Sequence, residues 1–346
     1  MIQLYGYNCT GVITGHQENR VKRSLFLFVA ALTFGGALNV TLAHAQGLGN
    51  IGGRPIRIIV PVAPGGPSDT AVRILVPRLS EALRQTLVVD NRPSNNGVAG
   101  TEIAARANPD GLTLNIGNSG THAINPSLYK NLPYDPVRDF LPIIQIVTSG
   151  MVLVATPKLP VNSFKEFVAL AKKDPGKLNM AVASATGELA GEAMMAMSGI
   201  RMNNVRYKGS SPAEIATLSG ESDASMLTPL ASMQHIASGR LKAMGITSAK
   251  RSPLMPHVAT LAELGVTGYD FQIWHGLFAP LKTPDAITQK VHKAAMQALD
   301  APEVKERFTT LGFTIIGNTS QEFAAVVKSE LAKFRKVVTD AGIKIE

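Results

Sequence analysis

From Arg54 onward, short runs rich in β-branched residues alternate with amphipathic runs at helical spacing. The run 56–60 (IRIIV) has the composition of a buried strand, and 69–83 places its apolar residues on one helical face. The same rhythm predicts strands at 87–89, 112–116, 180–183, 205–207, 224–227 and 241–246. It predicts helices at 98–107, 163–173, 188–197, 212–218, 284–299, 302–311 and 320–341. This alternation is typical of the α/β class, with a parallel sheet flanked by helices.

Two longer apolar runs interrupt that rhythm, at 141–155 and 271–279. The first contains proline and has no helix between its halves. The second (FQIWHGLFA) is likewise a long apolar run without a helix. We interpret both as long strands that carry the chain out of one domain and back again. Trp274, the only tryptophan, lies in the second run, and we expect it beside a cleft between the domains.

The N-terminal segment has the order of an export signal. Lys22 and Arg23 precede the uncharged apolar run 24–42, and small residues end at Ala45. The apolar run is diluted by glycine and asparagine, which argues against a membrane anchor. We therefore predict a signal peptide at 21–45 that is cleaved after Ala45, and a protein exported to the periplasm.

Residues 1–20 lack apolar periodicity, and we interpret them as a translation start placed too far upstream. Cleavage after Ala45 also removes Cys9, the only cysteine, so the mature chain has neither disulfides nor thiolate chemistry. The remaining length is too great for one small core and fits two α/β domains.

The net charge of +9 is spread along the chain, without a run of five basic residues, and aromatic residues make up only 5%. Nucleic-acid binding needs a clustered basic face, so this class is not favoured. The one dinucleotide-type glycine motif, at 47–52, precedes the first strand and lacks a following helix, which favours a chance match.

Other motifs of catalysis or metal binding are missing, including the Walker, H-E-x-x-H and G-x-S-x-G patterns. None of the five histidines of the mature chain lies within four residues of another: His122, His235, His257, His275 and His292. We therefore expect no metal, no cofactor and no enzyme activity, although a triad assembled in space stays open.

Three junctions between a predicted strand and a helix could hold an anion. The first, 61–69 (PVAPGGPSD), lies where parallel sheets bind ligands, and helix-start N–H groups carry partial positive charge. Within it Asp69 is either a ligand contact or a first-turn acid paired with Arg73. The junctions 184–187 and 118–122 are similar, which predicts a ligand held between two domains.

Several blocks of sequence resemble one known family, and they keep its order and spacing. The blocks are IRIIVPVAPGGPSDT, VVDNRP, PDGLTL, THAINPSLYKNLPYDPVRDF, YKGSSPA and LKAMGITSAKRSPLMPHVATLAE. They are similar to the periplasmic receptors of tripartite tricarboxylate transporters, also called Bug receptors. The resemblance covers nearly all of the mature chain.

The resemblance implies a two-domain periplasmic binding protein of type II-like form, with two crossing hinge strands. It places domain 1 at 46–146 and 269–346 and domain 2 at 147–268. The family binds small carboxylates in the interdomain cleft and delivers them to a separate membrane permease. The same resemblance favours a monomeric receptor that performs no chemistry.

The resemblance also implies a set of ligand-binding residues, drawn from the three junctions and one strand end. They are Val62, Ala63, Gly65, Gly66, Ser68, Asp69, Thr121, His122, Ser184, Ala185, Thr186 and Thr228.

This chain departs from the family pattern in ways that bear on the ligand. The junction 184–188 is about two residues shorter and brings Glu188, and Thr228 stands where the family usually has aspartate. Val62 replaces a bulkier residue. Which carboxylate is bound, its charge and the existence of a cognate permease are therefore left open. A periplasmic sensor of a small acid and a hydrolase or isomerase using the same cleft are the alternatives.

Overall fold

The computed structural model describes residues 53–207 and 210–340, which belong to one unit spanning Asn50–Glu346. The predicted signal peptide with its cleavage site, the proposed start site, Cys9 and the glycine motif at 47–52 all lie outside the described residues.

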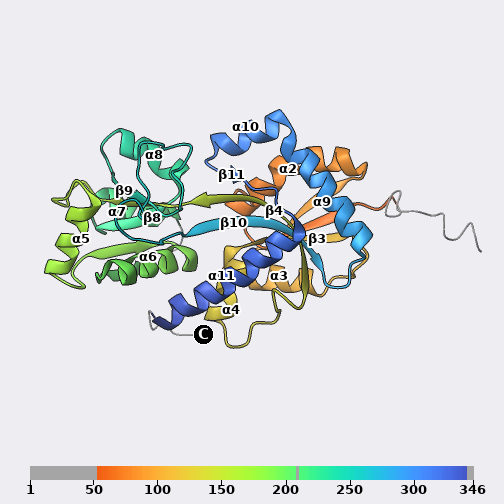
Figure 1. Cartoon of the computed structure of the whole chain (residues 1–346), viewed down its shortest axis with the longest axis horizontal. Helices are drawn as coiled ribbons and strands as arrows, with labels where there is room; N and C mark the ends of the chain where they lie inside the picture. The colour runs from red at the N-terminus through yellow and green to blue at the C-terminus, as the bar shows by residue number, and fades with distance from the viewer. Residues whose placement is uncertain (1–52, 208–209, 341–346) are drawn as a thin grey trace, which may run out of the picture. The chain divides into compact units, whose positions relative to one another are not determined.

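The first of two sheets has six strands in the order β11-β4-β10-β3-β1-β2. Their bounds are β1 (Ile56–Val60), β2 (Leu87–Asn91), β3 (Thr113–Asn118), β4 (Phe140–Gly150), β10 (Gln272–Pro280) and β11 (Thr314–Ile315). β1 is parallel to β2 and β3, as predicted. The sheet is nevertheless mixed, because the returning strand β10 inserts antiparallel between β3 and β4 (Figure 1).

Helices cover both faces of this sheet. Along β1 alternate side chains point to opposite faces, so Ile56 and Ile58 join one apolar cluster and Ile59 joins another. The first cluster involves α2 (Pro67–Leu83), α9 (Asp285–Asp300) and α10 (Pro302–Thr310). The second involves α3 (Val98–Ala105), the π-helical turn η2 (Gly120–Ile124), α4 (Asn125–Leu128) and α11 (Ser320–Asp340). A short 3₁₀ turn, η1 (Asn95–Gly97), precedes α3.

The second sheet has five strands in the order β7-β6-β8-β5-β9. The strands are β5 (Val152–Ala155), β6 (Asn179–Val182), β7 (Asn203–Arg206), β8 (Ala224–Leu227) and β9 (Lys242–Ile246). The helices are α5 (Phe164–Lys173), α6 (Ala185–Ser198), α7 (Ser210–Ser219) and α8 (Pro229–Ala237). Leu153 packs in the cluster with α5 and α6, whereas Val152 and Val154 pack in the cluster that includes α8.

Two connections join the sheets, which confirms the predicted two-domain α/β architecture. β4 stays paired with β10 until Gly150, and β5 begins at Val152. The return runs through residues 247–271. At the crossing, the Thr247 hydroxyl accepts from the Met151 amide at 2.7 Å and donates to the Phe271 carbonyl at 2.8 Å. One side chain therefore ties the two connections together.

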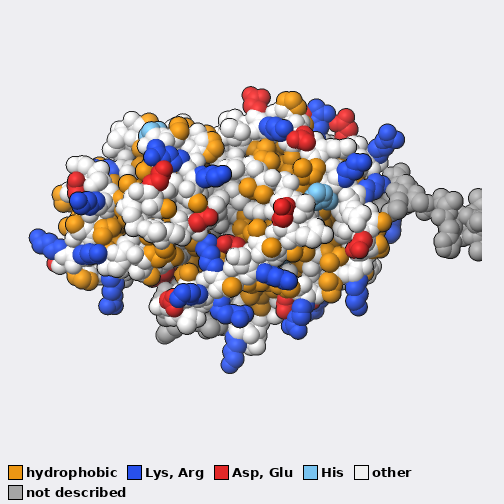
Figure 2. Space-filling view, in the orientation of Figure 1, with side chains coloured by type: hydrophobic (Ala, Val, Ile, Leu, Met, Phe, Trp, Pro, Cys, Tyr) orange, Lys and Arg blue, Asp and Glu red, His pale blue; other side chains and the backbone are white. Residues whose placement is uncertain are grey.

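In the part of the chain that the structure describes, the helical segments that were not predicted are the short turn η1, η2 with α4, and the helix α8. α4 and α8 each have proline in their first two positions, where a missing N–H costs a helix nothing. Among the described residues, no helix has the length and hydrophobicity required to cross a bilayer. Figure 2 shows Lys and Arg dispersed over the visible face and interspersed with Asp and Glu.

Candidate functional site

A pocket opens where the starts of α2, η2 and α6 meet, and we call it the central pocket. Elements of both sheets contribute to it, and β10 supplies part of its wall. Its lining residues are Val62, Pro67, Ser68, Asn96, Asn118, Ser119, Gly120, Thr121, Ile124, Asn125, Ser184, Ala185, Thr186, Ile273 and His275.

The α2 side of the pocket is a tight turn held by Asp69. Gly65 adopts a left-handed φ of 83°, which favours glycine, and its N–H donates to the Asp69 carboxylate at 2.8 Å. The same carboxylate accepts from Arg73 at 2.8 Å and from Asn91 at 2.9 Å. Burial raises the pKa of Asp69, but these hydrogen bonds outweigh burial and lower the pKa below its ordinary value. Asp69 therefore holds the turn at Gly65 in place through its hydrogen bonds and does not itself line the central pocket.

A chain of hydrogen bonds runs from η2 through α2 to β10. The Thr121 amide donates to Asn118 Oδ1 at 3.0 Å, and Asn118 Nδ2 donates to Ser68 Oγ at 3.1 Å. Ser68 Oγ lies 3.1 Å from His275 Nδ1. Either group can donate in this contact, because a serine oxygen can accept two hydrogen bonds and the role of the ring nitrogen depends on the histidine tautomer. The chain of hydrogen bonds fixes three elements of one pocket wall.

The Ser68 and His275 pair has the residue types of a nucleophile and base, but its surroundings oppose that chemistry. Burial lowers the pKa of His275 to about 4, so the imidazole is a weak base at neutral pH. Within the described residues, His275 Nε2 is buried without a hydrogen-bond partner, so a carboxylate does not orient the ring. Ser68 is itself buried. The pair is better suited to positioning than to bond cleavage.

The α6 side of the pocket begins a turn earlier than predicted. The helix starts at Ala185 and not at Glu188, because Ser184 caps it by accepting from the Gly187 amide at 3.2 Å. The first-turn acid Glu188 is paired with Arg206, at 2.8 Å and 3.1 Å. Ala185 and Thr186 are thus first-turn residues, whose amides have no acceptor within a helix.

The electrostatics of the central pocket come from the backbone. None of its lining residues is Lys, Arg, Asp or Glu, and its one histidine is neutral at physiological pH. The starts of α2 and α6 lie in its wall, and helix starts carry partial positive charge. The two sides approach closely, since a Cβ added to Gly120 would lie 3.7 Å from Thr186 Oγ1. The arrangement suits an anion held by amides and hydroxyls.

The structure brings half of the predicted site residues together at this pocket: Val62, Ser68, Thr121, Ser184, Ala185 and Thr186. Gly65 and Thr228 line an adjoining pocket, described below. Ala63 is exposed, and its carbonyl accepts from the amide of Gly66, the N-cap of α2.

His122 does not reach the pocket surface. Its ring is buried, with its centroid 4.1 Å from that of Phe278 and 4.8 Å from that of Phe140. Its Nδ1 lies 2.9 Å from the hydroxyl of Thr121. Burial lowers the pKa of His122 to about 3, so the ring is neutral. His122 therefore lies beneath the wall of the central pocket, where its ring contacts the hydroxyl of Thr121.

Five lining residues lie outside the three junctions singled out in the sequence analysis: Asn96, Ile124, Asn125, Ile273 and His275. Alternation along β10 places Ile273 and His275 on one face and Trp274 on the other. Trp274 lies in the predicted strand, but its side chain packs against α11, with its ring centroid 5.3 Å from that of Phe323. It is therefore behind the strand and not in the pocket, which corrects the predicted placement.

Within residues 53–207 and 210–340, His, Cys, Asp and Glu side chains form no group of three or more that could hold a metal ion. What the pocket offers is a set of neutral donors.

Comparisons with known proteins place these features in a family. A family model described as "Tripartite tricarboxylate transporter family receptor" matches residues 71–343. The chain is 33% identical to the protein BugT of Bordetella pertussis over 296 residues, covering 85% of this chain and 91% of BugT.

Two similar solved structures have ligands named with them. Rpa4515 of R. palustris, with adipate, has a TM-score of 0.75 and 32% identity, covering 84% of this chain and 98% of that one. MatC of Rhodopseudomonas palustris, with bound malate, has a TM-score of 0.72 and 29% identity, covering 82% and 99%. The chain therefore belongs to the tripartite tricarboxylate transporter receptor family.

Proposed function

We propose that this receptor binds a small carboxylate in the central pocket. The observation that carries the proposal concerns α2, which follows a strand of the first sheet, and α6, which follows a strand of the second. Both helices begin at one pocket whose lining has no charged side chains. A carboxylate there would receive hydrogen bonds from the first-turn amides of α6 and from hydroxyls, while the helix dipoles favour its charge. The relatives with adipate and malate support the same ligand class.

Ligand contacts would be made by the predicted residues that line the pocket, together with Asn118. Domain 1 would comprise 46–146 and 269–346, and domain 2 would comprise 147–268. Ligand that touches both α2 and α6 would favour the closed arrangement over an open one. The two domains would rotate about the crossing at Thr247, because the hydrogen bonds of its hydroxyl join both connections there.

The family supports a role outside the cytoplasm. The chain would be exported by the signal at 21–45, cleaved after Ala45, and would act as a monomer in the periplasm. It would deliver its ligand to the membrane subunits of a tripartite tricarboxylate-type permease. The weak base at His275 and the buried hydroxyl of Ser68 argue for binding without turnover.

The test is a thermal-melt screen of the exported protein, freed of carried-over ligand, against small carboxylic acids and their primary amides. Ligand at about 100 times its dissociation constant adds roughly 2.7 kcal/mol, which is several degrees for a protein of this size. We expect the acids and not the amides to raise the melting temperature. Equal shifts by acid and amide would contradict carboxylate recognition, and release of a product would favour the enzyme alternative.

A further inference from the structure

A second pocket adjoins the central pocket, and we call it the apolar pocket. The two share Pro67 and Ile273 as a common wall. Resting on the function proposed above, we propose that the ligand is a monocarboxylic acid with an uncharged, apolar body. Its carboxylate lies at the helix starts of the central pocket, and its body lies in the apolar pocket.

The lining of the apolar pocket is richer in hydrocarbon than that of the central pocket. Six of its ten lining residues have hydrocarbon side chains, compared with five of fifteen in the central pocket. The six are Pro67, Pro229, Leu230, Ile273, Leu311 and Phe313, and the other four are Gly65, Thr70, Ser149 and Thr228. A carboxylate moved there would lose its hydration and meet fewer hydrogen-bond donors than in the central pocket.

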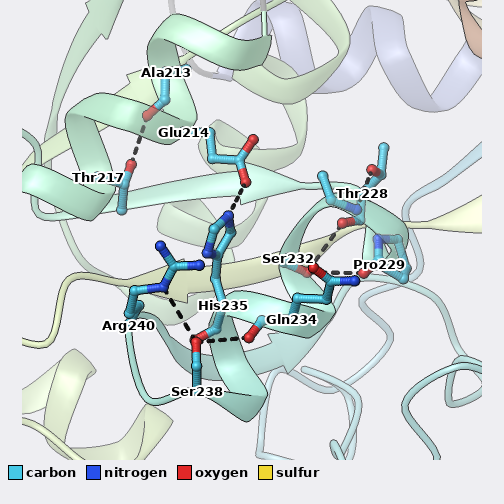
Figure 3. Close-up of polar contacts among 11 residues, drawn as sticks. Ala213, Glu214, Thr217, Thr228, Pro229, Ser232, Gln234, His235, Ser238 and Arg240 are labelled. Atoms are coloured by element: carbon cyan, nitrogen blue, oxygen red, sulfur yellow. Dashed lines mark hydrogen bonds and ion pairs between the residues drawn. The ribbon is translucent and has the colours of Figure 1, made fainter.

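The polar groups of Thr228, which also lines the apolar pocket, are engaged by the start of α8. Its hydroxyl accepts from the Ala231 amide at 3.4 Å, and its carbonyl accepts from the Ser232 hydroxyl at 3.1 Å (Figure 3). Thr228 is thus a helix cap. Both of its oxygen atoms already accept hydrogen bonds within α8, so what it can offer a ligand in this pocket is the proton of its hydroxyl.

Leu230 lies in the first turn of α8, and its side chain is open to solvent. Its helix is joined to α7 by His235, whose Nε2 lies 3.0 Å from Glu214, as Figure 3 shows. Leu230 is nevertheless 46% exposed. Covering a half-exposed leucine in such a lining with an apolar group of the ligand lowers the free energy, because apolar surface leaves water.

The part of the central pocket that adjoins a third pocket does not favour a second carboxylate either. A third pocket shares Asn96, Ser184 and Ala185 with it and contains Arg206. The Arg206 guanidinium already makes a two-point pair with Glu188. A dicarboxylate reaching this end would have to compete with that carboxylate, whereas a monocarboxylate would not.

The test compares hexanoate with adipate, which have the same number of carbons, by titration calorimetry on the exported protein. Butyrate and octanoate extend the series. Each buried methylene contributes about 0.8 kcal/mol, so affinity should rise about fourfold per methylene. Hexanoate should also bind at least tenfold more tightly than adipate. Tighter binding of adipate would overturn the inference and leave the carboxylate receptor intact.

A matched pair of variants tests the location of the apolar body. Leu230→Asp places a carboxylate at the apolar pocket and should flatten the rise of affinity from butyrate to octanoate. Leu281→Asp changes a leucine of similar exposure outside both pockets and should leave the series unchanged. An unflattened series in Leu230→Asp would overturn the placement. Absence of binding by every acid in the series would instead contradict the proposed function.

Discussion

The hydroxyl of Ser68 lies 3.1 Å from Nδ1 of His275, so the start of α2 is bonded to the strand β10. β10 is also the strand that pairs along β4 up to the crossing between the sheets. The wall of the central pocket and the strands that lead to the crossing are therefore joined by one hydrogen bond. Removing that bond should affect stability and ligand affinity together.

We predict that Ser68→Ala lowers the free energy of unfolding by about 1–3 kcal/mol, because Asn118 Nδ2 and His275 Nδ1 both lose a buried partner. Ligand affinity should fall as well, since the wall loses its fixed geometry. Ser80→Ala, in the last turn of the same helix, is the control. Chemical denaturation and calorimetry of both variants measure the effects, and equal stability of the two would contradict the role of the Ser68 hydroxyl.

We predict that the protein loses stability as the pH falls from 6.5 toward 4. Burial lowers the pKa of His275 to about 4 and that of His122 to about 3, whereas an unfolded histidine has a pKa of about 6.5. Between these values the unfolded chain binds protons that the folded chain does not, so stability rises with pH. Each histidine should lower the free energy of unfolding by about 1 kcal/mol between pH 7.5 and pH 5.5. Chemical denaturation at both pH values measures this loss.

A variant separates this histidine contribution from that of buried acids. Burial raises the pKa of Glu330 and of Glu192, which stabilises the folded state as pH falls and so opposes the histidines. His275→Gln should therefore weaken the loss of stability on acidification by about 1 kcal/mol. His257→Gln, at an exposed position, should not. The same pH profile in both variants would show that His275 does not titrate as its burial implies.

We predict that Asp69→Ala destabilises the fold by about 2–4 kcal/mol, since it removes the acceptor of Gly65, Arg73 and Asn91. Because its pKa is lowered, the stability it contributes is present at neutral pH and is lost as the pH falls below about 3.8. Asp285→Ala removes an exposed first-turn acid from α9 and should cost less than about 1 kcal/mol. Similar losses in the two variants would mean that the Gly65 turn does not depend on Asp69.

Elements with a strong local pattern could be predicted closely. The run 56–60 became β1 with the same bounds, because three isoleucines and a valine among five residues favour a buried strand. The start of α6 was placed too late because Thr186 and Gly187 favour loops more than helices. The cap made by Ser184, not the propensity of the following residues, decides where that helix begins.

The candidate site was predictable only where it lies at strand-to-helix junctions. Ser68 and Thr186 follow buried strands, so the rule for ligand sites in α/β sheets found them. His275 is 207 positions from Ser68 in sequence, and its strand inserts antiparallel between β3 and β4. That insertion is a tertiary arrangement, and the alternation within 271–279 indicates only that Ile273 and His275 share a face. The sequence pattern does not indicate which face borders the ligand.

The crossing offers the last prediction, at Thr247. Its hydroxyl is buried, accepting from the Met151 amide at 2.7 Å and donating to the Phe271 carbonyl at 2.8 Å. Thr247→Val keeps the shape of the side chain but leaves the Met151 amide and the Phe271 carbonyl without this partner. The free energy of unfolding should fall by about 1–3 kcal/mol.

Hydrogen exchange at the Met151 amide tests the contact directly. Exchange should be faster in Thr247→Val, because the hydrogen bond to Thr247 no longer has to break. Thr217→Val also replaces a buried hydroxyl with a methyl group, but that hydroxyl donates to the Ala213 carbonyl within α7, so exchange at Met151 should not change. Unchanged Met151 exchange in Thr247→Val would show that the two connections hold their arrangement without this side chain. Faster exchange together with weaker ligand binding would identify Thr247 as the residue that couples them.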